Sequence, residues 1–225
     1  FNCTFYYIPI GKNIYCNIED GQMESLRYRI SLKEYFTLYG LLFECNNTLL
    51  KDKKTTFAFF EKQKKRNFIL SKEITSSKQA PTTEDKRYYS GAWFEEYTYL
   101  RIKEELALRD EDISMSLKIY RNDLSHNDNE IDVAFMFENK LYIIECKVSM
   151  NGYGKEPQHH IENYLYKLAA VSKDFGLIVR PYIFTLHKME RLSEDSRKNI
   201  NKRMRILGIC NIVNGKELSE QKIKI

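Results

Sequence analysis

Two consecutive apolar runs with a period of two constrain the fold of this chain more than any other feature. The first run is EIDVAFMF at residues 130–137, and the second is LYIIECKV at residues 141–148. Alternate side chains of a β-strand share a face, so each run presents one face that is wholly apolar. The few residues between the runs favour an antiparallel hairpin. The sequence therefore predicts a hydrophobic β-hairpin that is buried in a sheet.

The second face of this hairpin carries charged residues. Asp132 lies on the first strand, and Glu145 and Lys147 lie at the end of the second strand. Residues that are directly opposite share a face, so Asp132 must lie opposite Glu145 or Lys147, and the paired numbers sum to 277 or 279. In either register we expect the three side chains to lie within about 5 to 8 Å of one another.

Two carboxylates at such a short separation predict a bound divalent cation. The carboxylates of Asp132 and Glu145 would repel each other, and burial makes both charges costly unless a cation neutralises them. Oxygen ligands suit Mg²⁺ or Mn²⁺. Lys147 would then position the attacking water, help to deprotonate it, or stabilise the developing negative charge. The alternative is a surface ion pair between Glu145 and Lys147 with little energetic consequence.

Bulk properties exclude several classes of protein. The 225 residues are 43% hydrophobic, which is enough for a packed core. Lys and Arg number 36 against 31 Asp and Glu, so the net charge of +5 permits an anionic partner without requiring one. The five cysteines are odd in number and widely spaced, so we expect neither a disulfide framework nor a zinc site, and the cytoplasm fits best. No apolar stretch reaches the roughly 18 residues of a membrane span.

The chain divides into three segments by composition. Residues 3–18 form two aromatic and β-branched runs around Gly11, which predict a hairpin. Residues 21–86 predict a small helical, winged-helix-like module. Its first helix begins after Ser31 and carries apolar residues at helical spacing from Leu32 to Leu42, a second basic helix lies near residues 55–70, and a polar connector follows at 71–86. The basic run of that second helix either contacts nucleic acid or is a solvated face. The remainder, 87–225, predicts an α/β domain with helices near 91–109, 158–173 and 193–206 and strands near 115–120, 131–137, 141–148, 177–185 and 209–213.

The motif IDV followed by IIECK resembles the PD-(D/E)xK nuclease superfamily, in which two acids and a lysine hold metal and drive phosphodiester hydrolysis. With GAWFEEYTYL from Gly91 and YLYKLAAVSKDFGLI from Tyr164, the chain resembles the nuclease domain of CRISPR-associated effectors that carry an N-terminal CARF sensor. This resemblance implies a restriction-endonuclease-like mixed sheet flanked by helices over 87–225, preceded by the winged-helix-like module. Residues 1–20 would be the C-terminal hairpin of a truncated, Rossmann-like CARF sensor. Because the chain opens on Phe1, we expect it to be a segment of a longer protein.

The same resemblance implies a function. It implies a homodimeric, cytoplasmic, metal-dependent endonuclease of type III CRISPR antiviral defence that cuts single-stranded RNA or DNA, or nicks supercoiled DNA. A cyclic oligoadenylate, expected to be cyclic tetra-adenylate, would activate it through the sensor, most of which is not in this chain. RNA and DNA are not distinguished, because stacking and charge tolerate either sugar.

The resemblance also implies further site residues. A helix-borne acid matches Glu95, which shares an apolar helical stripe with Tyr99, whereas Glu96 heads a less consistent stripe and stays an alternative. Glu95 and the backbone carbonyl of Cys146 would join Asp132 and Glu145 as metal ligands. Lys167, on the helix after the core lysine, would hold the scissile phosphate.

Two other functions remain open from the residues. One is a restriction-type DNA endonuclease without second-messenger control. The other is a non-catalytic module that holds nucleic acid through its basic helices.

Overall fold

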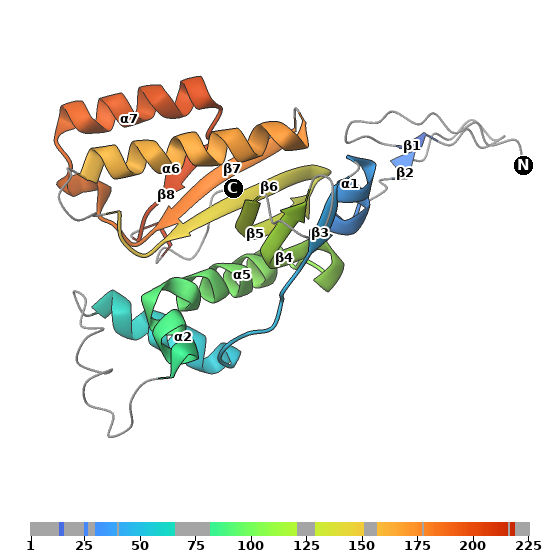
Figure 1. The fold of residues 1–225 in the computed structure, drawn as a ribbon, viewed down its shortest axis with the longest axis horizontal. Coiled ribbons are helices and arrows are strands. Elements are labelled where there is room, and N and C mark those ends of the chain that lie inside the picture. The colour runs from blue at the N-terminus through green and yellow to red at the C-terminus, as the bar shows by residue number, and fades with distance from the viewer. Residues whose placement is uncertain are drawn as a thin grey trace, which may run out of the picture.

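A six-stranded mixed sheet forms the centre of the molecule (Figure 1). The computed structural model describes residues 14–15, 25–26, 30–39, 41–65, 82–120, 129–150, 157–176, 178–215 and 217–218. The strand order is β3-β4-β5-β6-β7-β8; the pairs from β3 to β6 are antiparallel, and β6–β7 and β7–β8 are parallel. This sheet confirms the predicted α/β class. The strands are β3 (Leu42–Glu44), β4 (Ile113–Tyr120), β5 (Asn129–Phe137), β6 (Lys140–Lys147), β7 (Val179–Thr185) and β8 (Asn211–Val213).

Helices cover both faces of the sheet, with α6 and α7 on one side and α5 and α2 on the other (Figure 1). Period-two alternation in β6 divides its side chains between the two cores, since Ile143 packs with Leu165 of α6 and Ile144 packs with Phe94 of α5. No described helix combines the length and the apolar character that crossing a membrane would require. The α-helices are α1 (Leu32–Leu38), α2 (Lys53–Lys65), α4 (Thr83–Arg87), α5 (Trp93–Glu105), α6 (Pro157–Ser172) and α7 (Glu194–Leu207). The short helices are η1 (Tyr88–Ala92), η2 (Asp110–Asp112), η3 (Lys173–Phe175) and η4 (Met189–Arg191).

The predicted hairpin of β5 and β6 is confirmed. Its pairing runs from Phe137↔Lys140 to Val133↔Ile144, so the paired numbers sum to 277. The turn consists of Glu138 and Asn139 alone, with φ of 49° and 58°, as in the two-residue turns whose twist matches that of the flanking strands. This register places Asp132 opposite Glu145, which is one of the two expected alternatives.

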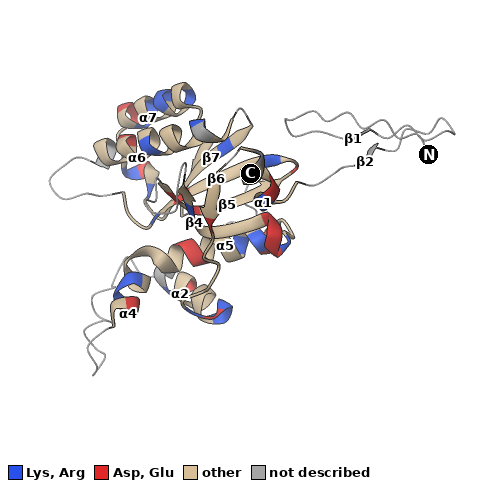
Figure 2. Cartoon of the chain, turned by 45° about the vertical axis from the view of Figure 1, so that its right-hand side comes forward, with Lys and Arg blue, Asp and Glu red and all other residues tan. Residues whose placement is uncertain are grey.

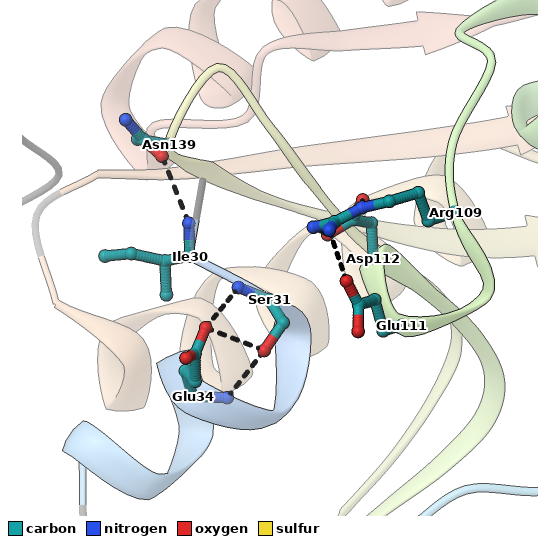
Figure 3. Close-up of polar contacts among 7 residues, drawn as sticks. All are labelled: Ile30, Ser31, Glu34, Arg109, Glu111, Asp112 and Asn139. Atoms are coloured by element: carbon teal, nitrogen blue, oxygen red, sulfur yellow. Dashed lines mark hydrogen bonds and ion pairs between the residues drawn. The ribbon is translucent and has the colours of Figure 1, made fainter. Parts of the chain in front are cut away.

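The turn of this hairpin is tied to the start of α1 (Figure 3). The amide of Ile30 donates to Oδ1 of Asn139 at 3.4 Å. Ser31 caps α1 as predicted, because its Oγ accepts from the amide of Glu34 at 3.3 Å and its own amide donates to Oε2 of Glu34 at 2.8 Å. Figure 3 also shows Arg109 beside η2, where it forms ion pairs with Asp112 and Glu111. The start of α1 is therefore anchored at the turn end of the hairpin.

The described residues between 30 and 65 pack into the same two cores as the sheet. The helix that was expected to include Leu42 ends at Leu38, and Leu42 begins β3, which pairs with β4. This pairing satisfies the backbone of the β4 edge. Phe36 of α1 joins one core, and Phe60 of α2 stacks on Tyr97 of α5 with ring centroids 3.6 Å apart. The described part of residues 21–86 therefore does not confirm a separate winged-helix-like module, which stays a prediction.

Two predicted segments lie largely outside the described residues. Residues 71–81, most of the predicted connector, are among them, together with residues 66–70 at the end of the predicted second helix, whereas residues 83–86 belong to α4, which Thr82 and Asp85 cap. In the predicted N-terminal hairpin, residues 3–13 and 16–18 also lie outside. The pairing that is described joins β1 (Ile14–Tyr15) to β2 (Ser25–Leu26), so the sensor hairpin over residues 1–20 stays a prediction.

Candidate active site

Asp132 and Glu145 lie at the point where the pairing of β5 and β6 ends. The described pairing stops at Val133↔Ile144, and Asp132 follows opposite Glu145. Here the backbone amide of Cys146 donates to Oδ2 of Asp132 at 2.7 Å. The carboxylate of Asp132 thus takes the place of a backbone acceptor on the neighbouring strand, which fixes its orientation.

The ammonium of Lys147 lies among three oxygen atoms. Its Nζ is 2.7 Å from Oε1 of Glu145, 3.1 Å from the carbonyl oxygen of Cys146 and 3.6 Å from Oδ2 of Asp132. Three of the four metal ligands that the resemblance implies therefore surround one cation in this structure. The structure brings Asp132, Glu145 and Lys147 together as expected.

A second lysine reaches the same carboxylate from the helix layer. Lys167 on α6 places its Nζ 3.3 Å from Oε1 of Glu145. Glu145 is only 4% exposed, whereas the side chain of Lys167 is 53% exposed. The pair therefore links a buried acid to the solvent-facing side of α6.

Burial and like charges make the site favour bound positive charge. Burial, together with the nearby Glu145 and Glu95 carboxylates, raises the pKa of Asp132 to about 7 against the opposing effect of Lys147. Burial works to lower the pKa of Lys147, but the charges of Asp132 and Glu145 outweigh it, so the net pKa lies above its ordinary value. Lys147 is consequently a cation at neutral pH, and Asp132 is held between its protonated and charged forms.

Of the two adjacent acids on α5, Glu95 lies within electrostatic reach of the cluster. Burial raises the pKa of Glu95, and the charge of Lys147 is the strongest effect that opposes this. Glu96 instead accepts hydrogen bonds from the amide of Leu50 and from Oγ1 of Thr56. Glu96 is only 1% exposed although it heads the less consistent stripe, whereas Glu95 is partly exposed. The reason is that α2 covers the side of α5 that faces away from the sheet.

The donor atoms fit a hard divalent cation with a small protein ligand set. Among the residues that the structure describes, no three His, Cys, Asp or Glu side chains are grouped closely enough to hold a metal ion. Glu95 is therefore not placed as a third side-chain ligand. Two carboxylates and one carbonyl, from Asp132, Glu145 and Cys146, suit Mg²⁺ or Mn²⁺, which usually keep several waters.

Sequence reasoning missed the aromatic partner of Lys147. The Nζ of Lys147 lies 5.4 Å from the ring centroid of Tyr164 on α6, a distance at which the ring attracts a cation. Tyr164 and Lys167 are three positions apart and thus neighbours on one side of the helix. That spacing was a signal that both side chains could reach the strand ends together.

Comparison with known proteins identifies relatives of this fold. A family model described as "Card1-like, endonuclease domain" matches residues 82–224. The protein VC1899 from Vibrio cholerae has a TM-score of 0.66 at 20% identity, over 97% of this chain and 66% of that chain. Can2 from Sulfobacillus thermosulfidooxidans, solved in complex with cyclic tetra-adenylate, has a TM-score of 0.61 at 19% identity, over 96% of this chain and 66% of that chain. A search of curated proteins finds no significant match.

Proposed function

Because the chain belongs to the family of Card1-like endonuclease domains, we propose that it hydrolyses phosphodiester bonds of nucleic acid with Mg²⁺ or Mn²⁺. The observation that carries the proposal is the convergence of two carboxylates and a carbonyl on the Lys147 ammonium. Two buried carboxylates this close repel each other unless a cation neutralises them or one of them takes up a proton. A divalent metal can replace the ammonium there.

Asp132, Glu145 and the carbonyl of Cys146 would hold the metal, with Glu95 nearby to orient bound water. When bound, the metal would help to generate hydroxide and would neutralise charge on the phosphate. Lys147 would then give up its carboxylate contacts, and the ring of Tyr164 would keep its ammonium at the site. From there Lys147 stabilises the negative charge that develops on the phosphate.

Lys167 is the residue best placed to meet the substrate first. Its side chain is half exposed and its ammonium already touches Glu145, so it can bind a phosphate oxygen without a change in the fold. We take the substrate to be single-stranded RNA or DNA, with nicking of supercoiled DNA as a further activity.

Regulation follows from the relatives and from the sequence resemblance. Can2 was solved with cyclic tetra-adenylate, and this chain covers 66% of its length. We propose that a sensor preceding the described sheet binds a cyclic oligoadenylate such as cyclic tetra-adenylate in a homodimer of the full-length protein. Cytoplasmic activation of this kind suits a role in type III CRISPR defence.

The test uses the full-length protein with Mn²⁺ and cyclic tetra-adenylate. Single-stranded RNA, single-stranded DNA and supercoiled plasmid are incubated with wild type, with Lys147→Ala and with Asp132→Asn. We expect cleavage by wild type that a chelator abolishes and that both variants lack. Cleavage no faster than that of Lys147→Ala on all three substrates would overturn the proposal. Cleavage of particular duplex sequences without the activator would indicate a restriction-type enzyme instead.

A further inference from the structure

The outer face of α6 and α7 combines exposed positive charge with exposed apolar side chains. Figure 2 shows basic residues along α7 in the outer helix layer. This helix has Lys or Arg at five positions and Asp or Glu at two. Among the large hydrophobic residues that the described part exposes, Tyr166 on α6 is 48% exposed and Ile206 on α7 is 73% exposed. Single exposed apolar residues are common on protein surfaces, so it is their combination with cations that distinguishes this face.

Only part of the positive charge on α7 is neutralised within the described residues. Lys198 pairs with Glu194 at 2.8 Å, and Arg203 pairs with Glu162 at 2.9 Å. Lys202 and Arg205 are exposed, and no described acid lies in ion-pair distance of either side chain. The two helices therefore leave cations free for an anionic partner.

Arg203 connects α7 to the aromatic ring on α6. Its guanidinium lies 5.7 Å from the ring centroid of Tyr166 and donates a hydrogen bond to the Tyr166 hydroxyl. The pairing with Glu162 holds the guanidinium in this place. The ring is consequently ordered before any ligand arrives, which lowers the entropic cost of stacking on it.

The residue that follows Tyr166 along α6 reaches the candidate active site. Lys167 follows Tyr166 along α6, and its Nζ lies 3.3 Å from Oε1 of Glu145. A nucleic-acid strand with one phosphate at Lys167 would therefore reach Tyr166 and α7 with the next few nucleotides.

We propose that this face, the α6–α7 face of Tyr166, Lys202, Arg203, Arg205 and Ile206, binds single-stranded nucleic acid beside the active site. The proposal rests on the nuclease function proposed above. Unpaired bases can stack on an aromatic ring while cations follow the backbone. A duplex keeps its bases stacked inside and would leave Tyr166 and Ile206 without a partner. The composition of the face therefore favours a single strand.

Binding is measured by fluorescence anisotropy on the full-length protein, without divalent metal, with labelled oligothymidylate and oligouridylate over a series of salt concentrations. The double variant Lys202→Gln/Arg205→Gln is compared with Lys33→Gln/Lys118→Gln, which removes two exposed cations from α1 and β4. Each phosphate contact to a single strand contributes about 0.7 to the slope of log affinity against log salt concentration. The double variant on α7 should therefore lower the magnitude of this slope by about 1.4, and the control variant should not change it. Equal slopes and affinities for both variants and wild type would overturn the proposal.

The stacking part is tested separately at Tyr166. Tyr166→Leu should weaken binding about 5-fold or more, whereas Tyr166→Phe, which keeps the ring, should bind close to wild type. If Tyr166→Leu bound with wild-type affinity, the proposed stacking of a base on Tyr166 would be wrong.

Cleavage, measured with metal and activator, separates this proposal from the nuclease proposal. Suppose that wild type does not cleave, but Lys202→Gln/Arg205→Gln lowers the salt dependence of binding. The nuclease proposal then fails, whereas the proposed binding by the α6–α7 face is supported. If wild type cleaves and Lys202→Gln/Arg205→Gln binds as wild type does, the proposed binding by the α6–α7 face is wrong and the nuclease proposal is supported.

Discussion

Two buried glutamates on opposite sides of the sheet differ in the partners that neutralise them. Glu96 accepts from a backbone amide and a threonine hydroxyl, which are neutral donors held by the chain. Glu145 instead meets the ammonium groups of Lys147 and Lys167 at the ends of long side chains. Burial is nearly equal, at 1% and 4% exposed. The kind of partner, and not the depth of burial, therefore separates a structural acid from one that can exchange its counter-ion.

The largest effect that this comparison predicts is on cleavage. Glu145→Gln should lower the cleavage rate by about 10³-fold, the upper range for loss of one group that stabilises charge. Its free energy of unfolding should change by less than about 1 kcal/mol, because losing the lysine contacts is offset by losing the repulsion from Asp132. Single-turnover cleavage and urea denaturation measure the two quantities. The matched control is Glu96→Gln, which should cleave at the wild-type rate per folded molecule.

The next effect is a pH dependence of stability in metal-free protein. The pKa of Asp132 is about 7 in the fold against an ordinary value of 3.8, so the folded chain binds this proton more tightly than the unfolded chain. Protonation of Asp132 therefore contributes up to a few kcal/mol to the free energy of unfolding. This contribution is fully present below about pH 4 and is lost as the pH rises through about 7. Urea denaturation in the presence of a chelator measures it. Asp132→Asn should remove this part of the dependence, and an unchanged profile in that variant would contradict the assignment.

A smaller effect is expected on the structural side of the comparison. Glu96→Ala leaves the Leu50 amide and the Thr56 hydroxyl without their acceptor, so it should lower the free energy of unfolding by about 2 kcal/mol. Thermal or urea denaturation checks this value. If Glu96→Ala instead abolished cleavage at full stability, Glu96 would have to replace Glu95 as the acid of α5 that serves the site.

The smallest effect concerns the exposed member of the lysine pair. Lys167→Gln should lower the ratio kcat/KM by about 10-fold, as expected for loss of one charge-assisted contact to phosphate. Most of the loss should appear in KM, since Lys147 remains to stabilise the reacting phosphate. If kcat fell more in Lys167→Gln than in Lys147→Ala, the roles of the two lysines would have to be exchanged.

The sequence predicts the hairpin site well because its geometry is local. Period-two alternation and a short connection place Asp132 opposite Glu145 without reference to the rest of the chain. The relation between Glu95 and Glu96 depends on α2, which packs against α5 from a distant part of the sequence. Likewise, Leu42 reads as helical until β4 provides an edge to pair with. These contacts are long-range, so helical periodicity alone does not contain them.

The connection through α6 has a consequence for the order of assembly during synthesis. Parallel pairing of β6 with β7 requires a crossover, so Lys167 arrives only after the hairpin has left the ribosome. Local contacts form before distant ones. Lys147, on the same strand as Glu145, accompanies the two carboxylates from the start. The nascent sheet thus carries its own counter-ion, and it does not wait for the helix layer or for a metal ion to begin folding.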